Sequence, residues 1–497
     1  MLLAAAVRLP GLRSNPGWYT DEGSFLNVAT NLANGKWQYF ALGDSLLLLG
    51  RPPLFVYLLR VLIALAGPDI LVLRGLAATC GIASVGLLYG VSRSMFGARH
   101  AFFAGAMLAI LPGAVSYGRI GFTYNLLAPL ALAALFALWR FAESRRQIWL
   151  WSGAVLAGVS LATDYQGLVV LCLALVTAAV RRPRSLPTVA VLGLLPLGVC
   201  LAPLVFRVPA ATWHDLTYTY SRAGGGFPLQ FAWFFVRLGN LVQQDGWFAL
   251  GMVGLLLLPS GAGRTLTLAA VVLSLAGLLR AIDPVGQGSY HLIPLYPLLS
   301  IGLGAVVQRG IAASFAWFNE DVLGGLRMWP RWIRAVASLI SSLGTAVLVV
   351  APFAWMLIVD VVGLRSEMVT SLQFGRSSPW AVEGMVRALN PQLQPDDMVL
   401  ASPQVAWMIP AHVIDIQQVV ACEGERAHAL PEIERARFLY PCDVGSLHFV
   451  VQDDLIRSWA AQVMPEAARI VDLTSQWPLV FHVGEFSVYR NPAAPSP

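Results

Sequence analysis

Two adjacent carboxylates, Asp21 and Glu22, follow the first apolar segment of the chain, Met1–Leu12. In a membrane protein this position places ionisable groups where water meets the bilayer, and such groups are functional candidates. The alternative is a solvated turn without a chemical role. The choice between the two depends on which other polar residues share that side of the membrane.

Arginine carries nearly all of the positive charge, since Lys36 is the only lysine and the net charge is +6. The arginines are spread between apolar stretches rather than gathered on one face, which argues against nucleic acid as a partner. Hydrophobic residues make up 57% of the chain and charged residues 12%. A soluble domain cannot bury so much apolar surface, so the sequence predicts an α-helical polytopic membrane protein.

Further apolar stretches follow the first one and give about eleven transmembrane helices, by the length needed to cross the hydrocarbon core. They are Leu71–Val91, Ala101–Tyr117, Leu126–Phe141, Ile148–Ala162, Gly167–Val180, Leu186–Phe206, Val242–Leu258, Leu266–Leu279, Leu292–Val307 and Ala335–Val362. The run from Arg51 to Pro68 is left out because it is short, begins with two prolines and carries Arg60. We expect it to form a helix along the outer membrane surface.

Arginines cluster in every second connection between these stretches, which places those connections and the N-terminus in the cytoplasm. The remaining connections face outside, including those that hold Asp21, Arg119, Asp164 and the long stretch Arg207–Gly246. Cations that break this rule can be there to meet an anion. They are Arg51, Arg60, Arg207 and Arg222.

From about Ser366 the composition becomes typical of a soluble domain. Short β-rich runs alternate there with helix-like stretches, which predicts an extracytoplasmic α/β domain over residues 366–497, after a transmembrane domain over residues 1–365. The expected strands are Met398–Ala401, Leu447–Gln452, Arg469–Leu473 and Glu485–Tyr489, and the expected helices are Pro379–Leu389 and Asp453–Met464. An odd number of spans puts this domain outside the cell, on a protein of the inner (plasma) membrane.

Cys422 and Cys442 both belong to this external domain, where an oxidising environment favours a disulfide between them. The other cysteines lie in apolar stretches and are expected to be small buried residues. No spacing of His and Cys residues predicts a zinc site. The run Gly224–Gly226 lacks the Lys-Ser/Thr of a phosphate-binding P-loop, and the cytoplasmic connections are too short for a nucleotide-binding domain.

Several segments, taken in order, carry a family resemblance. They are Asp21-Glu22, RPPLFVYLL, LRGLAATCGIASVGLLYGVSRSMFG, YGRIGFTYN, GVSLATDYQG and SYHLIPLYP. Together they resemble the dolichyl-phosphate-mannose protein mannosyltransferases and, more broadly, glycosyltransferase family 39 of the GT-C fold. The resemblance covers most of the membrane part, and bacterial members often add an extracytoplasmic α/β tail.

The resemblance implies roles for individual residues. Asp21 matches the general base proposed for the family and Glu22 its neighbour, so both are expected catalytic residues. Arg51 stands where relatives often have His or Lys before Pro-Pro, and Arg119 matches a basic residue suited to a carrier phosphate. Both are expected to bind substrate.

Two departures from the family pattern concern the donor phosphate. Thr163 is followed by Asp164-Tyr165 where relatives commonly have Thr-Lys-Gly, and we expect Asp164 to be a helix-end residue. Tyr290-His291 stands where an Arg-Tyr pair is frequent. Tyr290 and His291 are still expected substrate-binding residues, but more of the phosphate binding is left to arginines.

The implied activity moves a sugar from a polyprenyl-phosphate donor to an acceptor outside the cytoplasm, with mannosyl transfer to a protein hydroxyl favoured. External cations would neutralise the departing phosphate while a carboxylate takes the proton of the hydroxyl. No cofactor is required by this scheme, and a divalent cation such as Mg²⁺ or Mn²⁺ is an open option. The expected partners are the donor, a protein, lipid or glycan acceptor and membrane lipid.

Two alternatives stay open. The first is an enzyme of the same fold that acts on a lipid or polysaccharide acceptor. The second is a transporter or flippase for a lipid-linked saccharide, which should show repeat symmetry and polar residues at mid-bilayer. The polar residues of this chain gather at the outer interface instead, which favours the enzyme.

Overall fold

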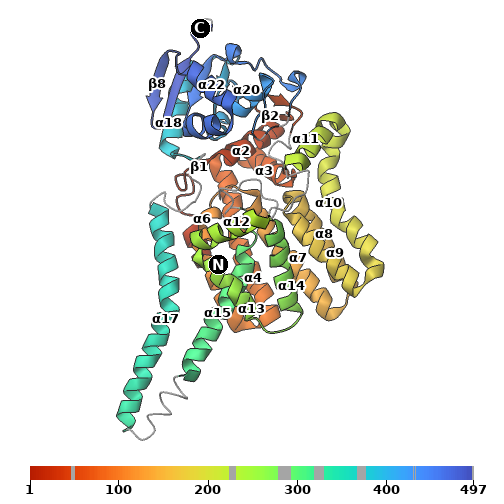
Figure 1. Cartoon of the computed structure of the whole chain (residues 1–497), viewed down its shortest axis with the longest axis vertical. Coiled ribbons are helices and arrows are strands. Elements are labelled where there is room, and N and C mark those ends of the chain that lie inside the picture. Colours follow the sequence, from red (N-terminus) through yellow and green to blue (C-terminus); the bar gives the residue numbers. More distant parts are fainter. Residues whose placement is uncertain are drawn as a thin grey trace.

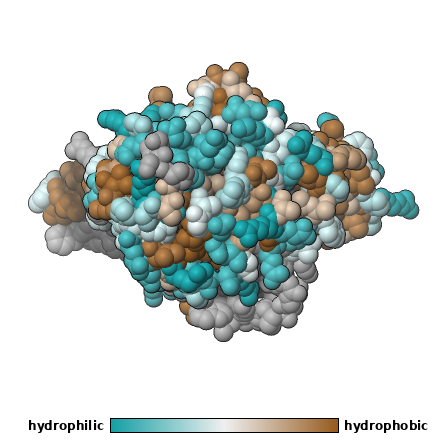
Figure 2. All heavy atoms as spheres, turned by 90° about the horizontal axis from the view of Figure 1, so that it is seen from above, coloured by the Kyte–Doolittle hydropathy of each residue, from teal (hydrophilic) through white to brown (hydrophobic). Residues whose placement is uncertain are grey.

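The structure is a computed structural model that describes residues 1–45, 51–222, 231–277, 291, 293–317, 330–365, 376–428, 430 and 432–494. A bundle of helices forms one part, and a smaller α/β domain lies at one end of this bundle (Figure 1). Seen from the side of the α/β domain, hydrophilic residues cover much of the centre, and hydrophobic residues gather at the two flanks (Figure 2).

Each apolar stretch predicted from the sequence contains a helix within its described residues. The helices are α1 (Leu2–Arg8), α4 (Ile70–Phe96), α5 (Ala98–Ile110), α6 (Pro112–Tyr117), α7 (Thr123–Ser144), α8 (Gln147–Thr163), α9 (Gly167–Arg181), α10 (Leu186–Arg207), α13 (Gly246–Leu256), α14 (Ala262–Gly277), α15 (Tyr296–Trp317) and α17 (Arg331–Arg365). The stretch Ala101–Tyr117 is divided between two helices because Pro112 starts a new one at its first position.

Four helical segments are long and apolar enough to cross a membrane among the residues that the structure describes: Ile70–Phe96, Thr123–Ser144, Pro183–Arg207 and Tyr296–Ser314. Side chains such as Leu195, Val199 and Phe206 on α10 are exposed although they are strongly apolar. Such a surface suits lipid rather than water. The chain is therefore a multi-pass membrane protein, while the count of about eleven spans stays a prediction.

The connections on the side of the α/β domain hold more helix than expected. Asp21 and Glu22 lie in the first turn of α2 (Thr20–Ala33). The predicted surface helix is α3 (Leu54–Ala66), which packs on α2. The stretch Arg207–Gly246, expected to be a loop, contains α11 (Pro209–Arg222) and α12 (Phe231–Gln244).

The α/β domain is built on a five-stranded sheet with the order β6-β5-β7-β9-β8. Its strands are β5 (Met398–Leu400), β6 (His412–Ile414), β7 (Phe449–Gln452), β8 (Leu479–Val483) and β9 (Phe486–Arg490), and its main helices are α18 (Pro379–Leu389), α19 (Pro403–Ala406), α20 (Ile416–Cys422) and α22 (Pro465–Thr474). Strand β5 is parallel to β6 and β7, whereas β9 is antiparallel to β7 and β8.

One predicted strand of this domain is wrong. Residues Arg469–Leu473 lie in α22, because Pro465 starts a helix in which Ala467, Ile470 and Thr474 are buried at helical spacing. The predicted helix Pro379–Leu389 is confirmed as α18. Ser366, where the second domain was predicted to begin, lies outside the described residues.

The segment that contains α2 and α3 shares one hydrophobic core with the α/β domain. Phe25 and Leu26 of α2, together with Phe55 and Leu59 of α3, belong to the same buried cluster as the sheet strands. Strand β1 (Trp18–Tyr19) pairs with β4 (Arg376–Ser377), which leads into α18. The start of the chain is thus held against its last domain.

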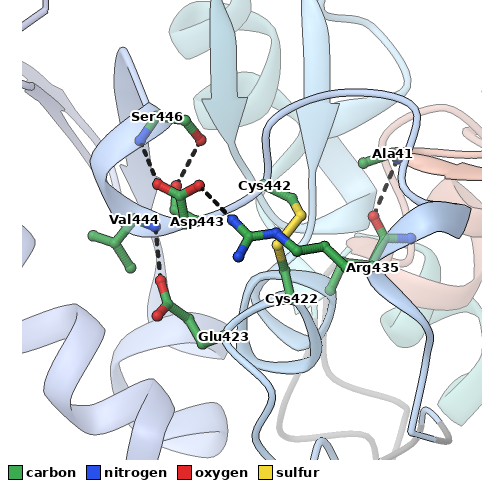
Figure 3. Close-up of a disulfide and its surroundings, with 9 residues drawn as sticks. Ala41, Cys422, Glu423, Arg435, Cys442, Asp443, Val444 and Ser446 are labelled. Carbon is green, nitrogen blue, oxygen red and sulfur yellow. Dashed lines mark hydrogen bonds and ion pairs between the residues drawn. A yellow bond between two sulfur atoms is a disulfide. The ribbon is translucent and has the colours of Figure 1, made fainter.

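Cys422 and Cys442 form a disulfide with their Cα atoms 5.8 Å apart, within the usual range (Figure 3). Glu423 next to it accepts a hydrogen bond from the Val444 amide at 3.0 Å. The bonded segment also touches the hairpin formed by β2 (Gln38–Tyr39) and β3 (Leu42–Gly43), where Leu439 N–H donates to the Ala41 carbonyl. The disulfide therefore stabilises a segment that contacts this hairpin.

Candidate functional site

The start of α2 is fixed by Glu22. The carboxylate of Glu22 accepts a hydrogen bond at 3.0 Å from the amide of Tyr19, the residue before the helix, which is the reciprocal half of a capping box. Asp21 and Glu22 also place negative charge at the positive end of the helix dipole. The sequence Tyr-Thr-Asp-Glu therefore begins a helix here, and Asp21 projects from its first turn.

Glu22 itself is fully buried against Arg74 of α4. Two nitrogens of Arg74 lie 2.6 and 2.8 Å from the carboxylate of Glu22, and neither side chain is exposed. The same carboxylate accepts from the Gly121 amide at 2.8 Å. All of these contacts are internal, so Glu22 holds α2 in place, and the catalytic role expected from the sequence has no support in this geometry.

Asp21 has a different environment. Its side chain is 23% exposed, and its Oδ2 lies 3.7 Å from Nη2 of Arg51. This separation exceeds that of a hydrogen bond, so the pair is a loose one. Asp21 is thus an accessible carboxylate beside a cation, as a general base for an approaching hydroxyl must be.

Arg51 lies at the centre of the site. Its Nη1 donates to Thr123 Oγ1 at 2.7 Å and to Asp164 Oδ2 at 2.9 Å. The guanidinium carbon lies 4.6 Å from the centre of the Tyr124 ring, a cation–π contact. Asp164 ends α8, as expected from the sequence, and its carboxylate also accepts from Thr123 Oγ1 at 2.8 Å. Arg51 is therefore firmly oriented toward Asp21.

His291 completes this group. Its Nδ1 lies 2.6 Å from the Tyr124 hydroxyl and 3.1 Å from Nε2 of Gln166. Burial and, to a smaller extent, the nearby charge of Arg51 lower the pKa of His291 to about 3. The imidazole is consequently neutral at physiological pH and contributes hydrogen bonding rather than charge. Tyr290 lies outside the described residues.

Arg119 does not join Arg51. Its side chain is buried, and its terminal nitrogens donate to four backbone carbonyls, two at the end of α1 and two in the connection that follows it. The acceptors are Val7, Arg8, Pro10 and Asn15, at 2.7 to 3.3 Å. The guanidinium therefore shapes the chain that leads to α2. The donor-phosphate role expected for Arg119 is not supported, because these internal carbonyls occupy both terminal nitrogens.

The structure adds residues that sequence patterns did not single out. Thr123, Tyr124 and Gln166 orient Arg51 and His291, and Arg74 binds Glu22. Arg74 has a sequence signal, since a charged residue near the end of an apolar stretch needs a partner. Thr123, Tyr124 and Gln166 lie in two of the segments that carry the family resemblance, but nothing in the sequence singles them out individually.

No group of three or more His, Cys, Asp or Glu residues is placed to hold a metal ion in the part of the chain that the structure describes. Asp21 and Asp164 both contact Arg51, so a divalent cation between them would have to displace a guanidinium. The predicted option of Mg²⁺ or Mn²⁺ stays open.

Residues 50–213 match the model of a family described as dolichyl-phosphate-mannose-protein mannosyltransferase. No curated protein matches the chain. The family match confirms the predicted resemblance and the predicted enzyme class, a glycosyltransferase. The matched segment contains Arg51, Arg119 and Asp164, whereas Asp21 and His291 lie outside it.

Solved structures share the fold at low identity. ArnT from Cupriavidus metallidurans, bound to undecaprenyl phosphate, is 16% identical with a TM-score of 0.67, over 99% of this chain and 97% of that one. An oligosaccharyltransferase from Archaeoglobus fulgidus, tethered with an acceptor peptide, is 14% identical with a TM-score of 0.56, over 94% of this chain and 70% of that one. Both are similar to this chain in the GT-C fold, as the resemblance implied.

Proposed function

We propose that this protein transfers a sugar from a polyprenyl-phosphate donor to a hydroxyl of an extracytoplasmic acceptor, with Asp21 as the general base. The observation that carries the proposal is the pairing of an accessible carboxylate, Asp21, with an oriented guanidinium, Arg51. The family model names a phosphate-linked sugar as the donor, and the similar ArnT structure is bound to undecaprenyl phosphate. Donor and fold thus point to the same chemistry.

The two contacts of Arg51 with carboxylates differ in a way that suits this reaction. Its bond to Asp164 is 2.9 Å long, whereas Asp21 lies 3.7 Å away. A donor phosphate approaching Nη2 would replace the looser contact and leave the tighter one, so Arg51 stays in place. The Asp21 carboxylate would then lie beside the bound phosphate, where it can accept the proton of the acceptor hydroxyl.

In the proposed reaction the acceptor oxygen attacks the anomeric carbon as the bond from that carbon to the phosphate oxygen breaks. The hydroxyl proton goes to Asp21, and the electron pair of the broken bond leaves with the polyprenyl phosphate. Arg51 stabilises the negative charge that develops on this phosphate. The Tyr124 ring supports Arg51 through the cation–π contact, and His291 holds the Tyr124 hydroxyl by a hydrogen bond.

The finer proposal is mannosyl transfer to a protein hydroxyl, by the name of the matching family model. The alternative is a lipid or polysaccharide acceptor. We also propose that α2, the site and the α/β domain face the outside of the plasma membrane. The Cys422–Cys442 disulfide supports this orientation, since disulfides persist in oxidising compartments.

The experiment is turnover by the purified protein in lipid, with a panel of polyprenyl-phosphate sugars and with peptide, lipid and glycan acceptors. Asp21→Asn should lower kcat by roughly 10²–10⁴-fold with little change in donor binding. Arg51→Gln should instead weaken donor binding by about 10–100-fold, since a hydrogen bond to a charged group is worth about 1.5–3 kcal/mol.

Asp44→Asn is the matched control. Asp44 is a half-exposed carboxylate that pairs with Arg207 at 3.2 Å and has no contact with Arg51. Its substitution should leave kcat unchanged. An Asp21→Asn enzyme with the turnover of the Asp44→Asn enzyme would contradict the assignment of Asp21 as the base.

A further inference from the structure

The α/β domain has an edge of the kind at which such folds bind ligands. Strands β6, β5 and β7 are parallel, so their carboxyl ends lie together, and the strand order reverses at β5. Ligands of open α/β sheets bind outside this edge, at the point of reversal. Ser402, Asp415 and Asp453 follow the three strands, and all three side chains are buried.

Another part of the chain occupies this edge. A Cβ atom built on Gly23 of α2 would overlap the carbonyl oxygen of Pro403, which follows β5. Ser24 of α2 lies 3.0 Å from the Tyr39 hydroxyl, and this hydroxyl lies 3.4 Å from Asp415. Helix α2 and the β2–β3 hairpin therefore lie where the ligand of a free α/β domain would lie.

A buried polar network links the same edge to the strand beside α2. Asp453 accepts hydrogen bonds from the Ser402 hydroxyl and, at 2.7 Å, from the amide nitrogen of Gln404. The same amide nitrogen donates to the Ser377 hydroxyl at 3.2 Å. Ser377 belongs to β4 and is the register partner of Trp18 in β1.

The position of Asp21 depends on both contacts. Strand β1 ends at Tyr19, and α2 begins at Thr20, so Asp21 follows directly from the paired strand. Gly23 stands two residues further on, against the Pro403 carbonyl. The α/β domain thus touches the chain on both sides of Asp21, through β4 before it and through Pro403 after it.

We propose that the α/β domain uses its ligand-binding edge to hold α2, and that Gly23 and Gln404 are positioning residues that set the distance between Asp21 and Arg51. This inference rests on the proposed role of Asp21. It assigns the domain a part in catalysis without any contact between its own side chains and the substrate.

Gln404→Met tests the network, because methionine keeps the volume of the side chain and removes its hydrogen bonds. A displacement of about 1 Å in a reacting group can cost roughly 10²-fold in rate, so we expect kcat to fall by about 10-fold or more. The donor KM should change less than about twofold, since the short hydrogen bonds of Arg51 go to Thr123 and Asp164, whereas its contact with Asp21 of α2 is 3.7 Å long.

Gln452→Met is the matched control. Gln452 is a buried glutamine of β7 whose amide nitrogen donates to Thr474 at 2.8 Å, on the side of α22 and not of α2. The Gln452→Met substitution should lower the stability of the domain and leave kcat of the folded enzyme unchanged. Equal losses of kcat in the two variants would show that only domain stability matters and would overturn the inference.

Gly23→Ala tests the second contact in combination with Asp21→Asn. The alanine must move α2 away from Pro403, so kcat should fall in the wild-type background and change little when Asp21 is already asparagine. Losses that multiply in the double variant would contradict positioning through Asp21. Unchanged turnover in Asp21→Asn alone would instead contradict the proposed function, so the two failures are distinguishable.

Discussion

Arg74 offers a sharp test of how α2 is held. A guanidinium has five N–H donors, and Arg74 has a partner for each of them. Two bonds go to Glu22, and the others go to the carbonyls of Leu12, Pro16 and Gly17 at 2.7 to 3.0 Å. The side chain is not exposed, so water cannot replace any of these bonds.

Arg74→Met removes the charge and leaves Glu22 buried beside two backbone amides. Breaking a buried ion pair from one side costs about 3–5 kcal/mol, and each carbonyl left without a donor adds up to about 1–3 kcal/mol. These terms are not additive, but the free energy of unfolding should fall by at least about 4 kcal/mol. This is a large share of the 5–15 kcal/mol by which a typical domain is stable.

The assay is thermal denaturation of the protein in detergent, in which the fraction of protein that stays monodisperse is measured at each temperature. Arg60→Met is the matched control, since Arg60 is an exposed arginine of the neighbouring helix α3. We expect a much lower transition temperature for Arg74→Met, and partial recovery in Arg74→Met/Glu22→Met, where no charge is left unpaired. An Arg74→Met protein that denatures at the temperature of Arg60→Met would refute the reasoning.

Three further predictions concern the α/β domain. Replacement of Cys422 and Cys442 by serine should lower the free energy of unfolding by about 3 kcal/mol, because a loop of this length is released in the unfolded chain. The variant should therefore denature at a lower temperature, equal to that of the reduced wild type. Burial raises the pKa of Asp415 and of Asp453 to about 6, so their protonation favours the folded state. This contribution to the stability of the domain is complete below about pH 4 and is lost as the pH rises through 6. The domain should therefore denature at a higher temperature at pH 5 than at pH 7.5. The variant Asp453→Asn should show a weaker dependence of this temperature on pH. A reporter that fluoresces only in the cytoplasm should be dark when fused after residue 497, and a bright fusion would contradict the external placement of the domain.

The sequence predicts the helical part well because apolar stretches of this length have few alternatives to helix in a membrane. The secondary structure of short segments in the α/β domain is predicted less well. Ile470 and Val471 are typical of strands, yet Pro465 and the two alanines that follow start a helix there. The helices α11 and α12 also escaped prediction. The composition of α11 is mostly polar, and α12, although largely apolar, is too short at 14 residues for a membrane span.

The site could be predicted only in part. The acidic pair and Arg51 were found as ionisable groups on the outer side, but their division of roles depends on burial. Glu22 is enclosed by Arg74 while Asp21, its neighbour in sequence, stays accessible. Likewise the sequence predicts that Arg119 and Arg51 both lie in external connections, and only the folded chain shows that backbone carbonyls bind the guanidinium of Arg119.

The pairing of β1 with β4 has a consequence for the biosynthesis of the enzyme. Trp18 and Tyr19 leave the ribosome early, whereas Arg376 and Ser377 follow only after the membrane helices have been made. At roughly 5–20 residues per second, β1 waits on the order of tens of seconds for its partner strand. During that time the segment that carries Asp21 lacks its docking surface, so a nascent chain already inserted in the membrane cannot yet hold its carboxylate at the site. Assembly order thus delays activity until the α/β domain has been synthesised and folded.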